Sequence, residues 1–107
     1  MSEKVLSALS MARGAGKLKI GFEAAKDAVL AGAPLAVVTA DLSQRSMRGV
    51  QRFCEEGYAE LLLLDETQDS IAEKFGWRFG VAAVTDENFA ALVKQQVQRE
   101  RKQEDRA

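Results

Sequence analysis

The chain has 107 residues and a formal net charge of −1 at pH 7, with 47% hydrophobic and 29% charged side chains. This length suits one domain, and a composition this apolar excludes an intrinsically disordered chain. The sequence has one cysteine and no histidine, which excludes an internal disulfide, the usual zinc sites and every catalytic triad that depends on histidine.

Hydrophobic periodicity divides the chain into alternating helices and strands. Apolar residues three and four apart predict helices, and short apolar or alternating runs predict strands. The elements in chain order are a helix ending at Gly14, a strand over 17–20, a helix from Phe22 to Gly32, a strand over 35–40, a helix ending at Gly57, a strand over 61–64, a helix from Thr67 to Gly76, a strand over 81–84 and a last helix beginning at Asp86.

Polar residues mark several of the helix starts. Ser2, the segment from Asp41 to Ser43, and the pair Thr85 and Asp86 each precede a periodic apolar segment and are suited to cap the first helical amides, while Thr67 with Ser70 begins the helix that ends at Gly76. The apolar stripe of the last helix fades after Val97. We therefore expect residues 1–98 to form a single domain and residues 99–107 to be a charged tail that frays into solvent.

Helices and strands that alternate with short connections favour helices on both faces of one sheet. We expect an α/β protein, a three-layer α/β/α sandwich around a small mixed four-stranded sheet. The strands over 35–40 and 61–64 are apolar throughout, as buried strands are, whereas the short first strand is expected at an edge or antiparallel. No segment has the length of a membrane span or the pattern of a signal peptide, so the chain is expected to be cytoplasmic.

Several motifs that could carry chemistry favour structural roles instead. Residues 14–17 read Gly-Ala-Gly-Lys, but a phosphate-binding loop follows a strand, and here a helix precedes and Leu18 follows. Cys54 lies on an apolar helical stripe with nothing to ionise its thiol. Trp77 could stack on a base or a partner, although a place in the core or at its rim is favoured. Acidic pairs sit beside caps and turns, so we expect no metal site, no cofactor and no enzymatic activity.

The segment from Lys17 to Lys26 is more informative. It places Gly21 between a basic strand and a helix N-terminus, where a missing side chain, free amides and the helix dipole together suit a phosphate or a base edge. The simpler interpretation is a helix start that needs a small residue. The sequence up to this point leaves both open.

Four segments resemble a known family when taken in order. They are residues 11–18, beginning Met-Ala-Arg-Gly, residues 21–24, Gly-Phe-Glu-Ala, residues 35–41, ending Val-Thr-Ala-Asp, and residues 81–90, Val-Ala-Ala-Val-Thr-Asp-Glu-Asn-Phe-Ala. Together they resemble the short bacterial members of the ribosomal L-seven-Ae and L-thirty-e superfamily, from about Leu9 to Leu92. The resemblance implies an α/β/α sandwich that binds kink-turn RNA with no cofactor and no reaction.

The resemblance also implies which residues bind RNA. In that family the contacts come from the glycine that leads the second helix, from basic residues beside it, and from an apolar loop before the last strand that covers an extruded base. The corresponding positions here, with their immediate neighbours, are Lys17, Lys19, Gly21, Phe22, Glu23, Lys26, Arg78, Gly80, Val81 and Ala82. The partners expected are structured RNA, ribosomal in origin, and ribosomal or translation-related proteins, with no membrane.

The chain departs from the family pattern after the glycine. The archaeal pattern has Asn, then Glu, and then Lys at the second, third and sixth places, where this chain has Glu23, Ala24 and Asp27, with Lys26 one place early. The middle of the chain, residues 21–93, is also acidic. An alternative is therefore a protein-interaction adaptor on the same fold with lost or weak RNA affinity.

Overall fold

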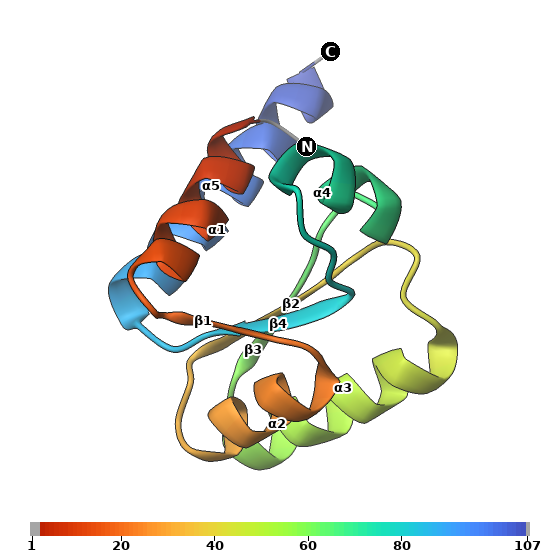
Figure 1. Cartoon of the computed structure of the whole chain (residues 1–107). Coiled ribbons are helices and arrows are strands. Elements are labelled where there is room, and N and C mark those ends of the chain that lie inside the picture. The colour runs from red at the N-terminus through yellow and green to blue at the C-terminus, as the bar shows by residue number, and fades with distance from the viewer. Residues whose placement is uncertain (1–2, 107) are drawn as a thin grey trace.

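The structure is a computed structural model that describes residues 3–106, with side chains described through residue 102. Nine elements alternate as the sequence predicts (Figure 1). They are α1 (Glu3–Gly14), β1 (Leu18–Ile20), α2 (Phe22–Leu30), β2 (Leu35–Val38), α3 (Gln44–Gly57), β3 (Glu60–Leu63), α4 (Gln68–Phe75), β4 (Val81–Val84) and α5 (Glu87–Arg106).

Local capping determines where three of the helices begin. The Ser43 hydroxyl accepts from the Ser46 amide at 3.1 Å, and the Thr67 hydroxyl accepts from the Ser70 amide at 3.2 Å. The Asp86 carboxylate accepts from the Phe89 amide at 3.0 Å. Each cap satisfies an amide that the helix itself leaves free. The caps predicted within residues 41–43 and 85–86 are confirmed at Ser43 and Asp86, and α4 begins after Thr67 as expected, whereas Ser2 lies outside the described residues.

The four strands form one mixed sheet in the order β1-β4-β2-β3. β4 is antiparallel to both β1 and β2, while β2 and β3 are parallel. The short β1 lies at an edge and pairs antiparallel, as expected. The expectation that residues 61–64 form a buried strand is wrong, because β3 is the other edge strand and Leu63 is 46% exposed. Leu64, just after it, is buried.

Two apolar clusters, one on each face of the sheet, confirm the α/β/α sandwich (Figure 1). The first cluster joins α1, α4 and α5 to the sheet and includes Leu9, Ile71 and Val93. The second joins α2 and α3 to it and includes Val29 and Phe53. Because successive strand residues point to opposite faces, β2 and β4 each contribute to both clusters.

Two glycines let α2 and α3 pack closely. A Cβ on Gly49 would lie 2.7 Å from Cζ of Phe22, and a Cβ on Gly57 would lie 2.6 Å from Cγ1 and 2.7 Å from the carbonyl oxygen of Val29. Phe22 also meets Phe53 edge to face, with ring centroids 5.5 Å apart. The start of α2 therefore packs against the middle of α3.

Helix α5 extends through Arg106, and the expectation that residues 99–107 fray into solvent stays a prediction. One contact at this end is the hydrogen bond that Arg101 donates to the Leu63 carbonyl at 2.7 Å, which joins the helix to the edge strand β3. In the part of the chain that the structure describes, no helix is long and apolar enough to cross a membrane.

Candidate nucleic-acid interface

One end of the sheet brings together the starts of three helices. The Gly21 amide, just before α2, donates to the Val81 carbonyl at 2.8 Å, and the Thr39 amide donates to the Gly80 carbonyl at 3.0 Å. The Ala40 amide donates to the Glu66 carbonyl at 2.9 Å. These bonds connect the segments that lead into α2, α3, α4 and β4. The positive ends of three helix dipoles therefore lie at one end of the sheet.

The start of α2 differs from those of α3, α4 and α5 in having no side-chain cap. Gly21 occupies the N-cap position with φ of 103°, a conformation that glycine adopts far more readily than other residues. The amides of Phe22, Glu23 and Ala24 find no acceptor among the described residues. The first turn of α2 thus presents unused donors of the kind that bind phosphate oxygens.

Beside this helix start runs the loop of residues 76–80, which leads into β4. Trp77 stacks between Phe75 and Phe79, with ring centroids 4.7 and 5.2 Å away, and the Arg13 guanidinium lies 4.6 Å from the centre of its ring. Trp77 is half-buried, so the structure favours the rim of the core. Arg78, in the same loop, forms an ion pair with Asp69 of α4.

Asp41 links the segment before α3 to the start of α4. Its carboxylate accepts from the Gln68 amide at 3.0 Å. Loss of hydration acts to raise the pKa of Asp41, but the hydrogen bond from the Gln68 amide, together with the charge of Arg78, brings that pKa below its usual range. Gly80 lies close by, since a Cβ there would be 3.1 Å from both Gln68 and Leu42.

The structure brings only some of the predicted RNA-binding residues together. Gly21, Phe22 and Glu23 form the start of α2, with Gly80 beside them. Lys26 is half-buried one turn further along α2.

The other predicted basic residues are spread more widely. Lys19 is exposed in the middle of the edge strand β1, opposite Ala83. Lys17 precedes the far end of this strand, where its carbonyl accepts from the Thr85 amide at 2.9 Å. Lys17 therefore lies away from the start of α2, and Arg78 is engaged by Asp69.

Val81 and Ala82 are not part of an accessible loop. They begin β4, are only 3% and 0% exposed, and belong to the clusters on opposite faces of the sheet. The Val81 carbonyl is occupied by the Gly21 amide. The loop that could cover a base is residues 76–80 instead, because the strand begins earlier than the resemblance implies.

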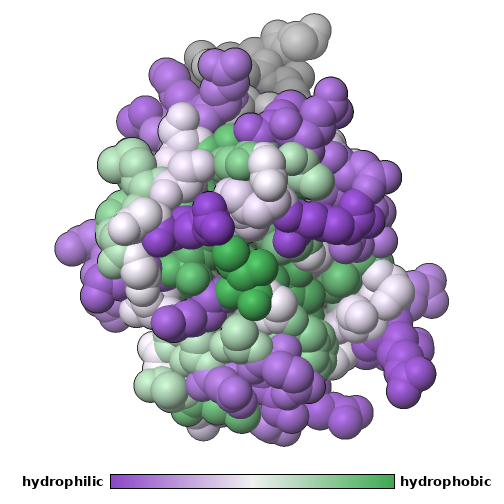
Figure 2. Space-filling view, viewed as in Figure 1, coloured by the Kyte–Doolittle hydropathy of each residue, from purple (hydrophilic) through white to green (hydrophobic). Residues whose placement is uncertain are grey.

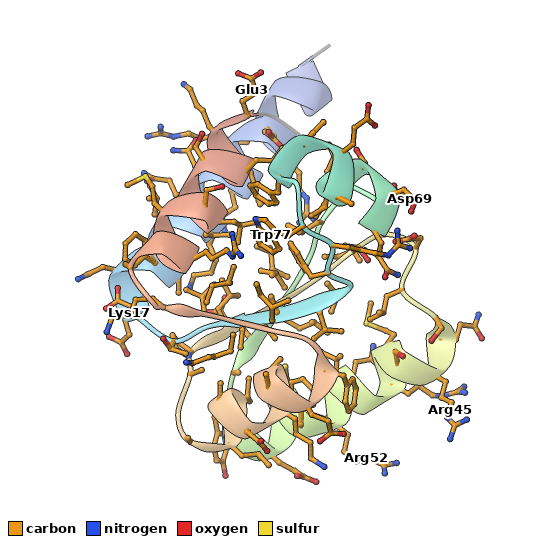
Figure 3. All side chains as sticks on the ribbon, viewed as in Figure 1. Glu3, Lys17, Arg45, Arg52, Asp69 and Trp77 are labelled. Carbon is orange, nitrogen blue, oxygen red and sulfur yellow. The ribbon has the colours of Figure 1, made fainter. Side chains whose placement is uncertain are left out.

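The residues predicted from the sequence to bind RNA do not include three arginines of α3. Arg45, Arg48 and Arg52 are exposed, and Figure 3 shows Arg45 and Arg52 pointing outward from α3, on the other side of the molecule from Lys17. None of the three forms an ion pair among the described residues. Their spacing of three and four residues on a predicted helix was the signal that could have found them; the acidic total of the middle segment concealed it.

Cys54 and residues 14–17, whose sequence patterns did not favour catalysis or phosphate binding, have structural roles. Burial raises the pKa of the Cys54 thiol to about 11, so it remains protonated near neutral pH. The Lys17 amide donates to the Ala12 carbonyl at 2.8 Å, and Gly16 has φ of 73°, as in a turn that ends a helix. Within the described residues, no group of three or more acidic, cysteine or histidine side chains could hold a metal ion.

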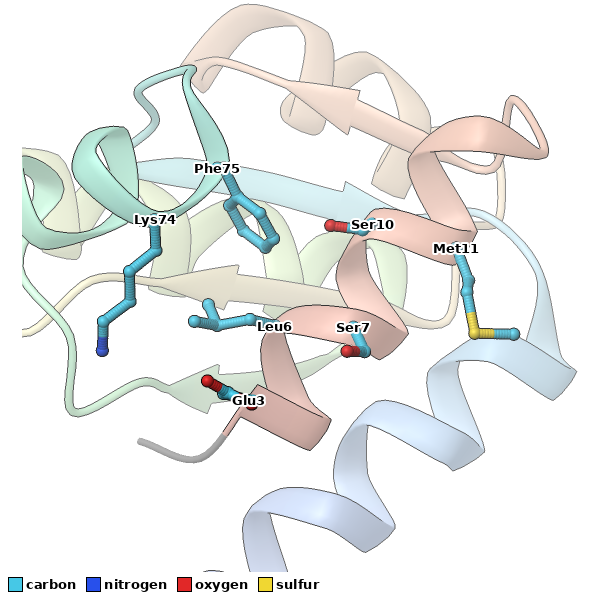
Figure 4. Close-up of a pocket in the computed structure, with 7 residues that line it drawn as sticks. All are labelled: Glu3, Leu6, Ser7, Ser10, Met11, Lys74 and Phe75. Atoms are coloured by element: carbon cyan, nitrogen blue, oxygen red, sulfur yellow. The ribbon is translucent and has the colours of Figure 1, made fainter.

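A hollow of about 600 Å³ lies between α1 and α4, on the opposite face of the sheet from α2 and α3. Leu6 and Phe75 point into it, with Met11 at its rim (Figure 4). Lys74 lines it too, but this ammonium is bound to Glu66 at 2.8 Å. Figure 2 shows that hydrophilic side chains surround the apolar surface in the middle of the molecule between the two helical layers.

Solved structures with a similar fold include the following two. A protein with unknown function from Bacillus halodurans C has a TM-score of 0.74 at 23% sequence identity, covering 87% of this chain and 99% of that one. The 15.5kD RNA binding protein of Giardia lamblia has a TM-score of 0.70 at 16% identity, covering 90% of this chain and 83% of that one. No family model and no curated protein matches the chain. At these identities, the likeness shows the fold alone.

Proposed function

We propose that this chain is a non-enzymatic protein that binds structured RNA at the start of α2. The observation that carries the proposal is the first turn of α2, where Gly21 leaves the backbone open and the next three amides have no acceptor among the described residues. Amides in this arrangement bind phosphates and position a nucleic acid on a protein. The RNA-binding protein of Giardia lamblia, built on the same fold, adds support.

The finer proposal is an RNA with a kink-turn, bound by a cytoplasmic protein associated with the ribosome, without a cofactor. A bent RNA suits a surface in which the uncapped helix start lies beside the loop of residues 76–80, because the two arms of a bend can contact different segments. Trp77 in this loop is half-buried, and its stacked neighbours hold the loop in place.

The exposed carboxylate of Glu23 favours the adaptor as a second candidate. A negative charge at this position is favourable for the helix dipole, but it repels a phosphate approaching the same amides. The two candidates therefore make different predictions for this side chain. If the first turn of α2 binds RNA, removing the charge raises affinity; if it does not, RNA affinity is unaffected.

The experiment measures binding of a kink-turn RNA and of a straight duplex of the same composition by gel shift. We expect tighter binding of the kink-turn RNA. We also expect Glu23→Gln to raise affinity by about two- to fivefold, the equivalent of about 0.5–1 kcal/mol. Glu87→Gln is the matched control, because Glu87 is an exposed first-turn carboxylate of α5, away from the start of α2.

Equal affinity for both RNAs, or no binding at all, would favour the adaptor. Substitution of Gly21 is a poorer test, since its φ of 103° strains any side chain although a Cβ would meet nothing within 4 Å. A loss of binding in Gly21→Leu would need circular dichroism to separate lost contact from lost structure.

A further inference from the structure

We infer that Arg45, Arg48 and Arg52 form a second RNA contact, which holds the phosphate backbone of a duplex arm next to the start of α2. This inference rests on the proposed RNA-binding function and extends it to a surface that the sequence resemblance does not include. We call these three residues the arginine stripe.

The arginine stripe is one face of a single helix. Residues three and seven places apart lie on the same side of an α-helix, and at 1.5 Å per residue the stripe is about 10 Å long. All three side chains are exposed. The helix has no acidic residue between Gln44 and Phe53, and its two carboxylates, Glu55 and Glu56, come only in the last turn.

These guanidinium groups are not used by the fold. No ion pair or hydrogen bond engages them among the described residues. Elsewhere in the described structure, Lys74, Arg78 and Lys94 each pair with a carboxylate, and Arg101 binds a carbonyl. The arginine stripe therefore presents three positive charges that are available to a ligand.

Close packing fixes the arginine stripe next to the start of α2. Gly49 lies one turn after Arg45 and one turn before Arg52, and the ring of Phe22 occupies the space that a side chain there would fill, 2.7 Å from the position of a Cβ. Phe22 is the first residue of α2 and directly follows Gly21. An RNA bound by the first turn of α2 can thus extend over α3 without leaving the protein surface.

The chemistry of the stripe favours a phosphate backbone. One guanidinium group can donate two hydrogen bonds at once to a phosphate group, and a duplex presents closely spaced phosphate charges along its length. Three arginines over about 10 Å match such a row of charges. An acidic protein segment is the competing ligand, and the experiment below separates the two.

The experiment compares the full chain with the triple variant Arg45→Gln, Arg48→Gln, Arg52→Gln. Glutamine is a good helix former, so the fold should persist, which circular dichroism checks. The control is Lys4→Gln, Arg99→Gln, Lys102→Gln, which removes the same charge from exposed positions on α1 and α5. The probes are one kink-turn RNA with a long duplex arm and the same RNA with that arm cut back.

We expect the triple variant to bind the long-armed RNA at least about tenfold more weakly than wild type, and its plot of log affinity against log salt to be flatter by about 3. The control variant should lose much less affinity for the long-armed RNA. On the short-armed RNA, wild type and triple variant should bind equally, because the stripe then has no phosphates to contact.

Three results would overturn the inference. If wild type binds the kink-turn RNA and the triple variant binds it with the same affinity and salt slope, the inference fails while the proposed function stands. If wild type binds neither RNA, both fail together. If a polyglutamate peptide binds in an arginine-dependent way and the long-armed RNA does not, the stripe is assigned to an acidic protein.

Discussion

At the scale of single residues, Glu66 is the one buried carboxylate among the side chains that the structure describes. It is 7% exposed, accepts a hydrogen bond from the Ser70 hydroxyl, and pairs with Lys74 at 2.8 Å. Burial acts to raise its pKa, but the hydrogen bonds from Lys74 and Ser70 prevail and lower it from 4.5 to about 2. A carboxyl with a lowered pKa stabilises the fold above its unfolded pKa and loses that contribution as the pH falls.

We therefore predict that the free energy of unfolding, measured with urea, declines between about pH 4.5 and pH 2 partly through Glu66. Glu66→Gln should be less stable than wild type at pH 7, and the difference between the two proteins should shrink across that range. Glu73→Gln is the control, since Glu73 is an exposed carboxylate on α4, the helix that carries Ser70 and Lys74. A stability difference that does not change with pH would contradict this role for Glu66.

At the scale of elements, the contact between α2 and α3 depends on Gly57. Replacing a helical glycine by alanine normally gains up to about 1 kcal/mol. At Gly57, however, the new Cβ would lie 2.7 Å from the Val29 carbonyl oxygen, a backbone atom that cannot simply rotate away. We predict that Gly57→Ala lowers the free energy of unfolding by roughly 1–3 kcal/mol, because the two helices must separate.

Gly14 provides the matched control for this prediction. It is likewise the last residue of a helix, α1, but a Cβ there meets nothing within 4 Å. Gly14→Ala should leave stability unchanged or raise it slightly, as urea unfolding of both variants would show. Equal effects of the two substitutions would mean that helix propensity, rather than the close approach of α2 to α3, determines the result.

At the scale of the whole molecule, neither of the two described groups with a large pKa shift, Cys54 and Glu66, is poised as a nucleophile or general base near pH 7. The chain has no histidine, the pKa of Cys54 is about 11, and that of Glu66 is about 2. We predict no turnover of nucleotides, esters or phosphoesters by the pure protein between pH 6 and pH 8. Nucleotide hydrolysis that disappears in Lys17→Ala would contradict this and identify residues 14–17 as a phosphate loop.

The sequence by itself determined the order and type of all nine elements. Periodicity shows which residues face the core, and caps such as Ser43 and Thr67 act within one helical turn, so both kinds of information are local. The same patterns predicted the sandwich and an edge or antiparallel place for β1. They could not show that β3 is an edge strand, because an apolar run such as residues 61–64 has the same sequence pattern in a central strand and in an edge strand.

Only the tertiary structure decided which charged residues lie together. Lys17 is four residues from Gly21, yet the extended strand β1 separates them, whereas Gly49, which lies between Arg45 and Arg52 on α3, packs against Phe22 at the start of α2. The periodicity of the apolar residues does not predict how exposed charged residues are arranged, because a charged side chain is tolerated at most solvent-exposed positions. The contacts that gather them come from packing between elements far apart in the sequence, and that packing exists only in the folded chain.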